Sequence, residues 1–215
     1  MQNKMGNTMT PQDAFFATLF DRKGAELPSF IVDPAPEALL EPDDSIEFHA
    51  SRLLVLLMFC GLDLPGKQAI RGRTKLAKLD FLLRYPSYLY RALQTHGRND
   101  LAKLLEESEI HNIEASMIRY KYGPWDSKYY DVFAYLSAKG LLEVVPKAGV
   151  DLFILTEQGV SAVSALLQDA AFQKLKDRCI IVRRVFGRWS GETLKTFIYR
   201  SFPEIVQQSL GSTIF

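Results

Sequence analysis

The sequence has few of the residues that bind metals or form disulfides. It contains two cysteines, Cys60 and Cys179, and three scattered histidines, His49, His96 and His111. This set is too small and too dispersed for a zinc site. Both cysteines lie in apolar helical runs, which indicates buried thiols in a reducing compartment.

Long apolar segments are also lacking. The longest apolar run, residues 53–60, is far too short to cross a bilayer. The first residues, MQNKMGNTMTPQD, contain no apolar core of a signal peptide. These absences predict a cytoplasmic protein with no membrane partner.

Motifs for catalysis are missing as well. The sequence shows no nucleophile elbow, no metal-binding histidine pair at helical spacing and no cysteine–histidine arrangement. Residues 61–68, GLDLPGKQ, match the spacing of a phosphate-binding loop, but Gln68 stands where a Ser or Thr would ligate magnesium. We therefore predict an interhelical turn here, no cofactor and no enzymatic activity. The competing hypothesis of an ATP-binding enzyme requires nucleotide binding that is lost on Lys67→Ala.

The charge is close to balanced overall but unevenly distributed. The net charge is +1, whereas residues 1–50 carry three basic and nine acidic side chains, a net charge of −6, so the rest carries +7. This asymmetry favours an acidic or polyanionic partner for the basic part of the chain.

The stretch 117–159 has the clearest pattern of secondary structure. Residues 117–122 suit a short strand, which Gly123-Pro124 should break. Asp126 is a candidate cap for a helix whose buried face follows the spacing of three and four residues. That face consists of Tyr129, Val132, Phe133 and Leu136.

A predicted hairpin follows this helix. Gly140 should end the helix, the runs 141–145 and 150–155 suit two strands joined by a Pro-Lys-Ala-Gly turn, and Thr156 should cap another helix. Helix, two-stranded wing and capped helix predict a winged helix-turn-helix. The fold class is therefore mainly α with a small β-wing, in a winged helix-turn-helix domain with a C-terminal helical extension.

Three regions are predicted along the chain. Residues 1–44 form an acidic, proline-rich arm, and Phe15, Phe16 and Phe20 either anchor it on a partner or pack loosely on its own domain. The winged-helix domain spans 45–167. Its first helix has the capping-box pair Asp44 and Glu47 and an apolar run that should place it at the centre of the core.

The third region, 168–215, contains basic amphipathic helices and a short tail from 203. An apolar seam repeats at three and four residues along its first helix and is a candidate surface for a dimer or another partner, although packing on its own domain also explains it. The seam residues with a proposed partner role are Phe172, Leu175, Val182, Phe186 and Trp189.

Basic side chains on both sides of the wing are candidates for contact with DNA phosphates, with a solvated helix face as the competing interpretation. The candidates are Arg71, Arg73, Lys75, Lys78, Lys128, Arg183, Arg184 and Arg188. The predicted recognition helix itself has no Arg, Asn or Gln and carries Asp131. Because major-groove recognition depends mainly on Arg, Asn and Gln, any contact with double-stranded DNA should be non-specific.

Three segments carry a resemblance to a known family. RTKLAKLDFLLRYP at 73–86 resembles the first part of the small middle components of three-component SMC-like ATPase systems, and RYKYGPWDSKYYDVFAYLSAKGLL at 119–142 resembles their winged-helix segment. FILTEQG at 153–159 is similar to their wing exit. The resemblance covers residues 46–167, and the nearest group is the small subunit of Lamassu-type antiphage defence complexes.

This resemblance implies a non-catalytic accessory subunit. Such a subunit sits on the heads of an SMC-like ATPase, next to an effector such as a nuclease, and helps to couple the sensing of foreign DNA to effector control. The alternative hypothesis is a stand-alone winged-helix transcription regulator, dimeric through the seam on residues 172–189.

Overall fold

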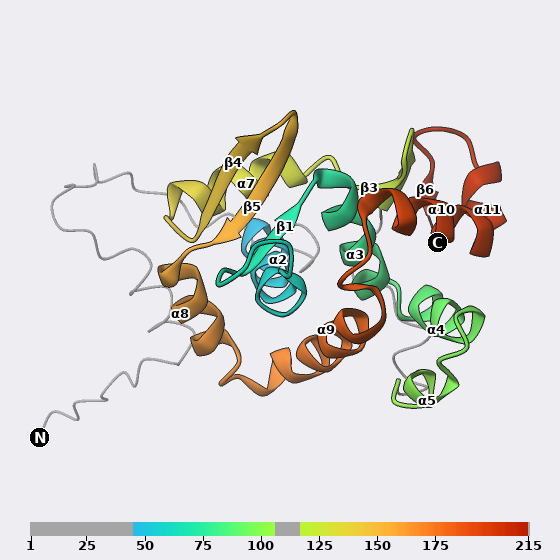
Figure 1. Cartoon of the computed structure of the whole chain (residues 1–215), viewed down its shortest axis with the longest axis horizontal. Helices are drawn as coiled ribbons and strands as arrows, with labels where there is room; N and C mark the ends of the chain where they lie inside the picture. The colour runs from blue at the N-terminus through green and yellow to red at the C-terminus, as the bar shows by residue number, and fades with distance from the viewer. Residues whose placement is uncertain (1–44, 106–116, 215) are drawn as a thin grey trace, which may run out of the picture. The chain divides into compact units, whose positions relative to one another are not determined.

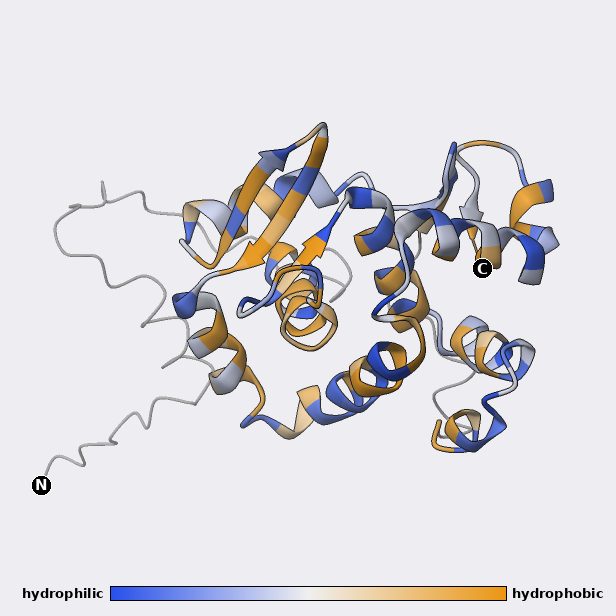
Figure 2. Ribbon diagram, viewed as in Figure 1, coloured by the Kyte–Doolittle hydropathy of each residue, from blue (hydrophilic) through white to orange (hydrophobic). Residues whose placement is uncertain are grey.

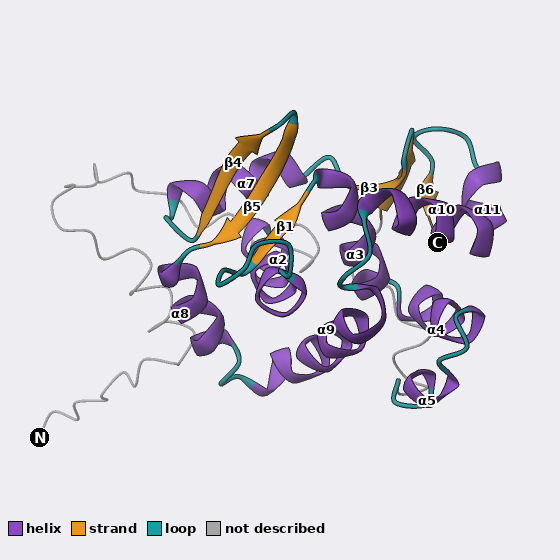
Figure 3. Cartoon of the chain, viewed as in Figure 1, coloured by secondary structure: helices purple, strands orange, loops and turns teal. Residues whose placement is uncertain are grey.

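The computed structural model describes residues 45–105 and 117–214, which belong to a single compact unit. This part of the chain is mixed α/β, mostly helical, with two small antiparallel sheets (Figure 1). Figure 3 shows the strands gathered in two groups between the helices. The predicted acidic arm, with Phe15, Phe16 and Phe20, lies outside the described residues.

Helix α2 (Ile46–Cys60) forms the centre of the core, as predicted. It contacts α3, α7, α8, α9 and the strands β1 and β5, and its ribbon is mostly orange in Figure 2. Ser45, rather than Asp44, caps it by accepting a hydrogen bond from the backbone N–H of Phe48 at 3.4 Å. The helix ends at Gly61, where a Cβ atom would lie within 3 Å of the backbone atoms of three other residues, so only glycine fits.

The first sheet has the strand order β1-β5-β4 and is antiparallel throughout. The hairpin of β4 (Leu142–Lys147) and β5 (Val150–Leu155) confirms the predicted pair of strands. Its turn is shorter than predicted, because Pro146 lies in the strand and only Ala148 and Gly149 have positive φ. The sequence did not predict β1 (Ala69–Arg71), which pairs with β5.

Three helices pack around this sheet at or near their predicted positions: α3 (Arg73–Arg84), α7 (Tyr129–Ala138) and α8 (Glu157–Leu166). The ring of Phe133 on α7 lies 4.6 Å from that of Phe153 on β5 and joins helix to sheet. Thr156 caps α8, as predicted, by accepting a hydrogen bond from the N–H of Gly159 at 2.9 Å.

The second sheet, with the order β3-β2-β6, joins distant parts of the chain. Strand β2 (Met117–Tyr120) was predicted, but the Gly123-Pro124 pair begins a paired strand, β3 (Gly123–Trp125), instead of breaking the structure. The predicted tail contains α11 (Pro203–Gln207) and strand β6 (Thr213–Ile214). Tyr85 links the sheet to the core, since its hydroxyl donates to the carbonyl of Ile214 and accepts from the N–H of Met117.

The remaining helices are α4 (Pro86–Thr95), α5 (Asn99–Ala102), α9 (Gln173–Phe186) and α10 (Gly191–Ser201). The apolar seam of α9 packs against α2 and α3 of the same chain, and Leu175, Val182 and Phe186 are buried there. Phe172 and Trp189, at the ends of the seam, are partly buried. Leu175, Val182 and Phe186 therefore belong to the core of this chain, as the alternative interpretation of the seam expects, whereas a partner role for Phe172 and Trp189 stays a prediction. Helix α10 likewise packs on α3, so no gap in packing separates 168–214 from the preceding domain.

Candidate functional site

The structure divides the candidate DNA-contacting cations into exposed and buried groups. Six of them are exposed: Arg71, Arg73, Lys128, Arg183, Arg184 and Arg188. Lys75 and Lys78 are only 3% and 1% exposed. Both side chains are buried and are not part of an open basic surface, so the proposed role of these two lysines on such a surface is corrected.

Lys75 has a structural partner in the loop that resembles a phosphate-binding motif. Its amino group lies 2.6 Å from a carboxylate oxygen of Asp63, and the other oxygen of Asp63 accepts the backbone N–H of Arg71 at 2.8 Å. Within the same loop, the N–H groups of Asp63 and Lys67 donate to the carbonyls of Ala69 and Leu64. These amides bond within the loop, so the loop is a turn leading into β1 and not a phosphate cradle.

A buried cluster of charges joins three helices of the core. Asp80 on α3 accepts hydrogen bonds from Arg52 on α2 at 2.8 Å and from the hydroxyl of Tyr129 on α7 at 2.7 Å. Arg84 lies 3.6 Å from Asp80 and donates to Asp126 at 2.7 Å. Burial opposes ionisation of Asp80, but the charges of Arg52 and Arg84 outweigh it and hold the pKa of this carboxyl below its ordinary value.

This cluster is closed to solvent, so its role is structural. Asp80 is fully buried and Asp126 nearly so. The sequence interpretation gave Asp126 a capping role, and one of its oxygens does accept the N–H of Lys128 just before α7. Its second oxygen serves the ion pair with Arg84, which no local pattern indicates because 42 residues separate the two positions.

One concave feature with functional side chains is a pocket of about 380 Å³ between the start of α3, the β2–β3 hairpin and the start of α7. We call it the aromatic pocket. Its lining residues are Arg73, Thr74, Lys78, Ile118, Tyr120, Tyr122, Gly123, Trp125, Ser127 and Tyr130. They include four aromatic residues, two cations and no carboxylate.

The aromatic rings of this pocket surround Trp125 and remain open to solvent. Tyr120, Tyr122 and Tyr130 are 51%, 49% and 55% exposed. The Trp125 ring centre lies 6.2 Å from that of Tyr120 and 6.0 Å from that of Tyr130. The ring of Tyr129, buried behind it at 5.0 Å, holds the indole in place.

The cations of the pocket are fixed by contacts with the protein. Arg73 pairs with Asp151 on β5 at 2.5 Å and stacks over Tyr130, with its guanidinium carbon 5.3 Å from the ring centre. Lys78 donates to the carbonyl of Pro124 at 2.9 Å. Burial, together with the charge of Lys195, lowers the pKa of Lys78 to about 7.

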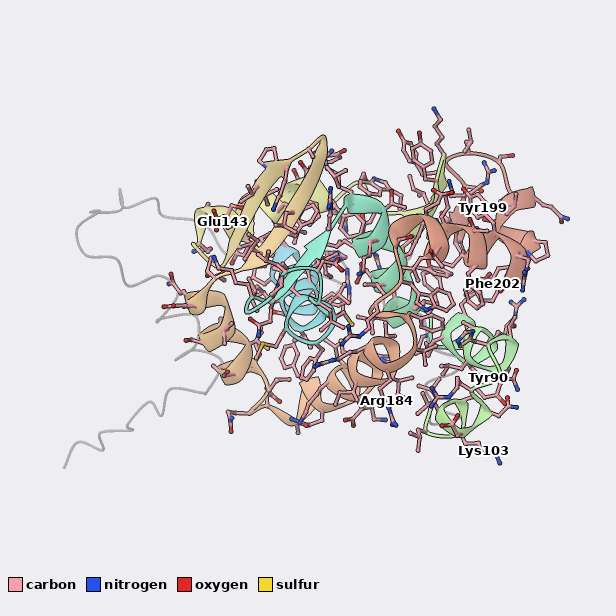
Figure 4. All side chains as sticks on the ribbon, viewed as in Figure 1. Tyr90, Lys103, Glu143, Arg184, Tyr199 and Phe202 are labelled. Carbon is pink, nitrogen blue, oxygen red and sulfur yellow. The ribbon has the colours of Figure 1, made fainter. Side chains whose placement is uncertain are left out.

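The tip of the β2–β3 hairpin adds positive charge at the rim. Lys121 and Lys195 lie 5.5 Å and 5.7 Å from the ring centre of Tyr122. Tyr199 on α10, labelled in Figure 4, donates its hydroxyl to the carbonyl of Lys121 at 3.2 Å. Gly123 has φ of 96°, and a Cβ there would lie 3.1 Å from the Tyr199 ring and 3.2 Å from Lys78, so glycine permits this close packing.

The sequence interpretation missed the aromatic residues of this pocket. A signal existed, because seven of the eleven residues from Tyr120 to Tyr130 are Tyr, Trp or Lys. In this segment the sequence was interpreted through its turn residues, Gly123 and Pro124, and through the helix cap Asp126 instead. Which aromatic rings face outward depends on the β2–β3 pairing, which was not predicted.

The exposed face of α7 is poor in groups that could recognise bases. Tyr130, Asp131, Ala134 and Ser137 are exposed on it. The described part of α9 differs, because Arg183 and Arg184 point outward near its end while its seam is buried; Figure 4 labels Arg184 on this helix. Arg188 continues this exposed series just after the helix.

Residues 45–105 and 117–214 contain no grouping of three or more His, Cys, Asp or Glu side chains suited to a metal ion. Across the same residues, no helix combines the length and apolar character needed to span a membrane. Comparisons with models of protein families, with curated proteins and with solved structures give no match to this chain.

Proposed function

We propose that the chain is a non-catalytic accessory subunit that binds DNA within an SMC-like ATPase–effector complex and is built on a winged helix. The elements α2, β1, α3, α7, β4 and β5 follow the order of a winged helix, and the sheet order β1-β5-β4 supports the same assignment. Helices α4 and α5 and the β2–β3 hairpin form an insertion between α3 and α7.

The observation that carries the DNA-binding proposal is the orientation of α9. Its apolar side is buried against α2 and α3, whereas Arg183, Arg184 and Arg188 are exposed together. Arginines arranged in this way can neutralise successive phosphates without recognising bases. Arg71, Arg73 and Lys128 are exposed on other elements and are further candidates for phosphate contact.

The proposed recognition of DNA is independent of sequence. Helix α7, which occupies the place of the recognition helix, exposes Tyr130, Asp131, Ala134 and Ser137 and none of the bidentate base-recognising side chains. A stand-alone transcription regulator needs such side chains. The only observation in favour of that alternative is therefore the order of the elements.

The proposed partners come from the resemblance of residues 46–167 to middle components of SMC-like systems. The subunit acts in the cytoplasm, contacts the ATPase heads and helps to control an effector such as a nuclease. The two thiols, Cys60 and Cys179, are free and buried, in keeping with a reducing compartment.

Two measurements test this proposal. The first is co-purification of the chain with an SMC-like ATPase; a well-behaved monomer that captures no such ATPase contradicts the assignment. The second is binding of a labelled duplex, measured by fluorescence anisotropy over a range of salt concentrations.

The arginine face of α9 makes a specific prediction in the duplex assay. Arg183→Glu combined with Arg184→Glu should weaken binding and reduce the salt slope by about two, since each lost phosphate contact removes about one counterion. Lys103→Glu combined with Arg200→Glu is the matched control, because it makes the same change in charge at exposed sites on other elements. An unchanged slope in the α9 variant excludes this face, and sequence-specific binding that survives raised salt favours the regulator.

A further inference from the structure

We propose that the aromatic pocket binds one nucleotide of an unpaired strand, with its base stacked among the exposed rings and its phosphate held by Arg73 and Lys78. This inference rests on the proposed function, because it assigns a second DNA contact that recognises unpaired bases. The α9 arginines contact the duplex backbone and the aromatic pocket takes a base that has left the stack.

The rings of the pocket provide the stacking surface. Tyr120, Tyr122 and Tyr130 are about half exposed, although tyrosine gains from burial, and Trp125 lies between two of them. Aromatic side chains of this kind stack on bases of any sequence, because every base has a π-face. The volume of about 380 Å³ lies in the range of pockets that hold small ligands.

The side chains that line the pocket favour a negatively charged ligand. Among the residues that the structure describes, no carboxylate lines it, while Arg73 and Lys78 do. A cationic ligand, such as a methylated lysine in an aromatic cage, would face these two charges and the nearby Lys121 and Lys195. Three described carboxylates beside the pocket are paired, Asp151 with Arg73, Glu192 with Lys195 and Asp126 with Arg84, and Asp131 adjoins Tyr130 in the chain.

Lys78 gives the pocket an ionisable amino group on its wall. Its side chain is 1% exposed yet lines the pocket, and the carbonyl of Pro124 takes one of its three N–H donors. A lysine buried with a single neutral partner is unfavourable in the free protein. A phosphate beside it would provide the missing counter-charge, and the hydroxyls of Thr74 and Ser127 line the same pocket.

The ligand chemistry, a base with a phosphate, has two sources: a free nucleotide and a nucleotide within a single strand. Titrations with thymidine monophosphate, a twelve-residue oligothymidylate and a twelve-base-pair duplex distinguish them. The full chain carrying Trp189→Phe retains Trp125 as its single tryptophan, so quenching of its fluorescence reports stacking in the pocket itself.

We expect the oligothymidylate to quench Trp125. Tyr120→Ala combined with Tyr122→Ala should weaken its binding about tenfold or more, as expected for lost base stacking, while duplex binding stays within about twofold. The Arg183→Glu, Arg184→Glu variant should show the opposite pattern. Leu104→Ala combined with Leu210→Ala, at exposed apolar sites away from the pocket, is the control.

The outcomes separate this inference from the proposed function. Duplex binding without any binding or quenching by the single strand overturns the pocket assignment and leaves the α9 face intact. Equal binding by the monophosphate supports the same pocket chemistry with a free nucleotide as the source. If the tyrosine variant keeps its oligothymidylate affinity but no longer captures the ATPase, the pocket is a protein-docking site and the inference is wrong.

Discussion

At the residue scale, Asp80 shows how much of the core depends on one carboxylate. It contacts Arg52, Arg84 and Tyr129, which lie on three different helices. Removing it leaves two buried guanidinium groups without their shared counter-ion. Because an unpaired buried charge is far less favourable than the intact pair, we expect Asp80→Ala to lower the free energy of unfolding by about 3–5 kcal/mol.

Denaturation by urea measures this loss, and Asp151→Ala is the control. Asp151 pairs with Arg73 at a position where the arginine is half exposed, and exposed pairs contribute about 0–1 kcal/mol. Similar losses for the two variants would contradict a structural role for the buried cluster.

Lys78 should make the stability of the protein depend on pH. Burial and Lys195 lower its pKa to about 7 in the folded chain, from an ordinary value of 10.5. Between these values the unfolded chain binds a proton that the folded chain does not, so stability rises with pH across this window and the penalty is largest at or below pH 7. Lys78→Met removes the titrating amino group and therefore this dependence of stability on pH.

We therefore expect the free energy of unfolding of the wild-type protein to increase relative to that of Lys78→Met as the pH rises from 7 to 10, by up to about 1.4 kcal/mol per pH unit. Urea denaturation of both proteins at several pH values measures this difference. Lys103→Met removes the same formal charge at an exposed site and serves as the control. Parallel stability profiles for wild type and Lys78→Met would show that Lys78 is charged at pH 7 without penalty.

The residue scale also shows which contacts a sequence can reveal. Thr156 was predicted correctly because its capping role depends on a neighbour three residues away. The Arg84–Asp126 and Arg52–Asp80 pairs span 42 and 28 residues. Such partners are decided by the packing of helices, which periodicity alone does not specify.

At the element scale, the turn between β4 and β5 can be tested by substitution. Ala148 has φ of 50° and Gly149 has φ of 74°, as a type I′ hairpin requires, and Asn-Gly is the preferred pair at these positions. Alanine in this conformation is strained by roughly 1 kcal/mol. Ala148→Asn should therefore raise the free energy of unfolding by about 0.5–1 kcal/mol, and Gly149→Ala should lower it by a similar amount.

Thermal or urea denaturation of Ala148→Asn and Gly149→Ala measures both changes in stability. Because no side chain lies within 4 Å of a Cβ at Gly149, any loss there reports backbone strain and not a clash. Opposite signs for the two substitutions support the turn, and a loss for both would show that the wing adopts another turn.

The elements that the sequence did not predict are the shortest ones. The long periodic helices α2, α3, α7 and α9 were all expected. By contrast, β1, β3 and β6 contain two or three residues each and exist through pairing with distant strands. The aromatic pocket depends on β3, so its rings could not be assembled from the sequence.

At the scale of the whole molecule, α9 shows the limit of periodicity. The repeat of Leu175, Val182 and Phe186 indicated correctly that one face is buried, but it could not indicate what covers that face. The structure covers it with α2 and α3 of the same chain. Within residues 45–105 and 117–214 the seam is part of one core, and the basic side chains at the end of α9 face solvent.

This arrangement predicts how the seam responds to mutation. Phe186 is fully buried and packs against Trp189 and Phe197, with ring centres 5.1 Å and 5.7 Å away. Phe186→Ala should lower the free energy of unfolding by about 3–5 kcal/mol, as large-to-small core substitutions do. Because the contacts lie within one chain, the unfolding midpoint should not change with protein concentration. Leu210→Ala, at a site 65% exposed, is the control. A midpoint that rises with protein concentration, together with little change in the free energy of unfolding on Phe186→Ala in the dilute protein, would indicate that the seam packs between chains instead.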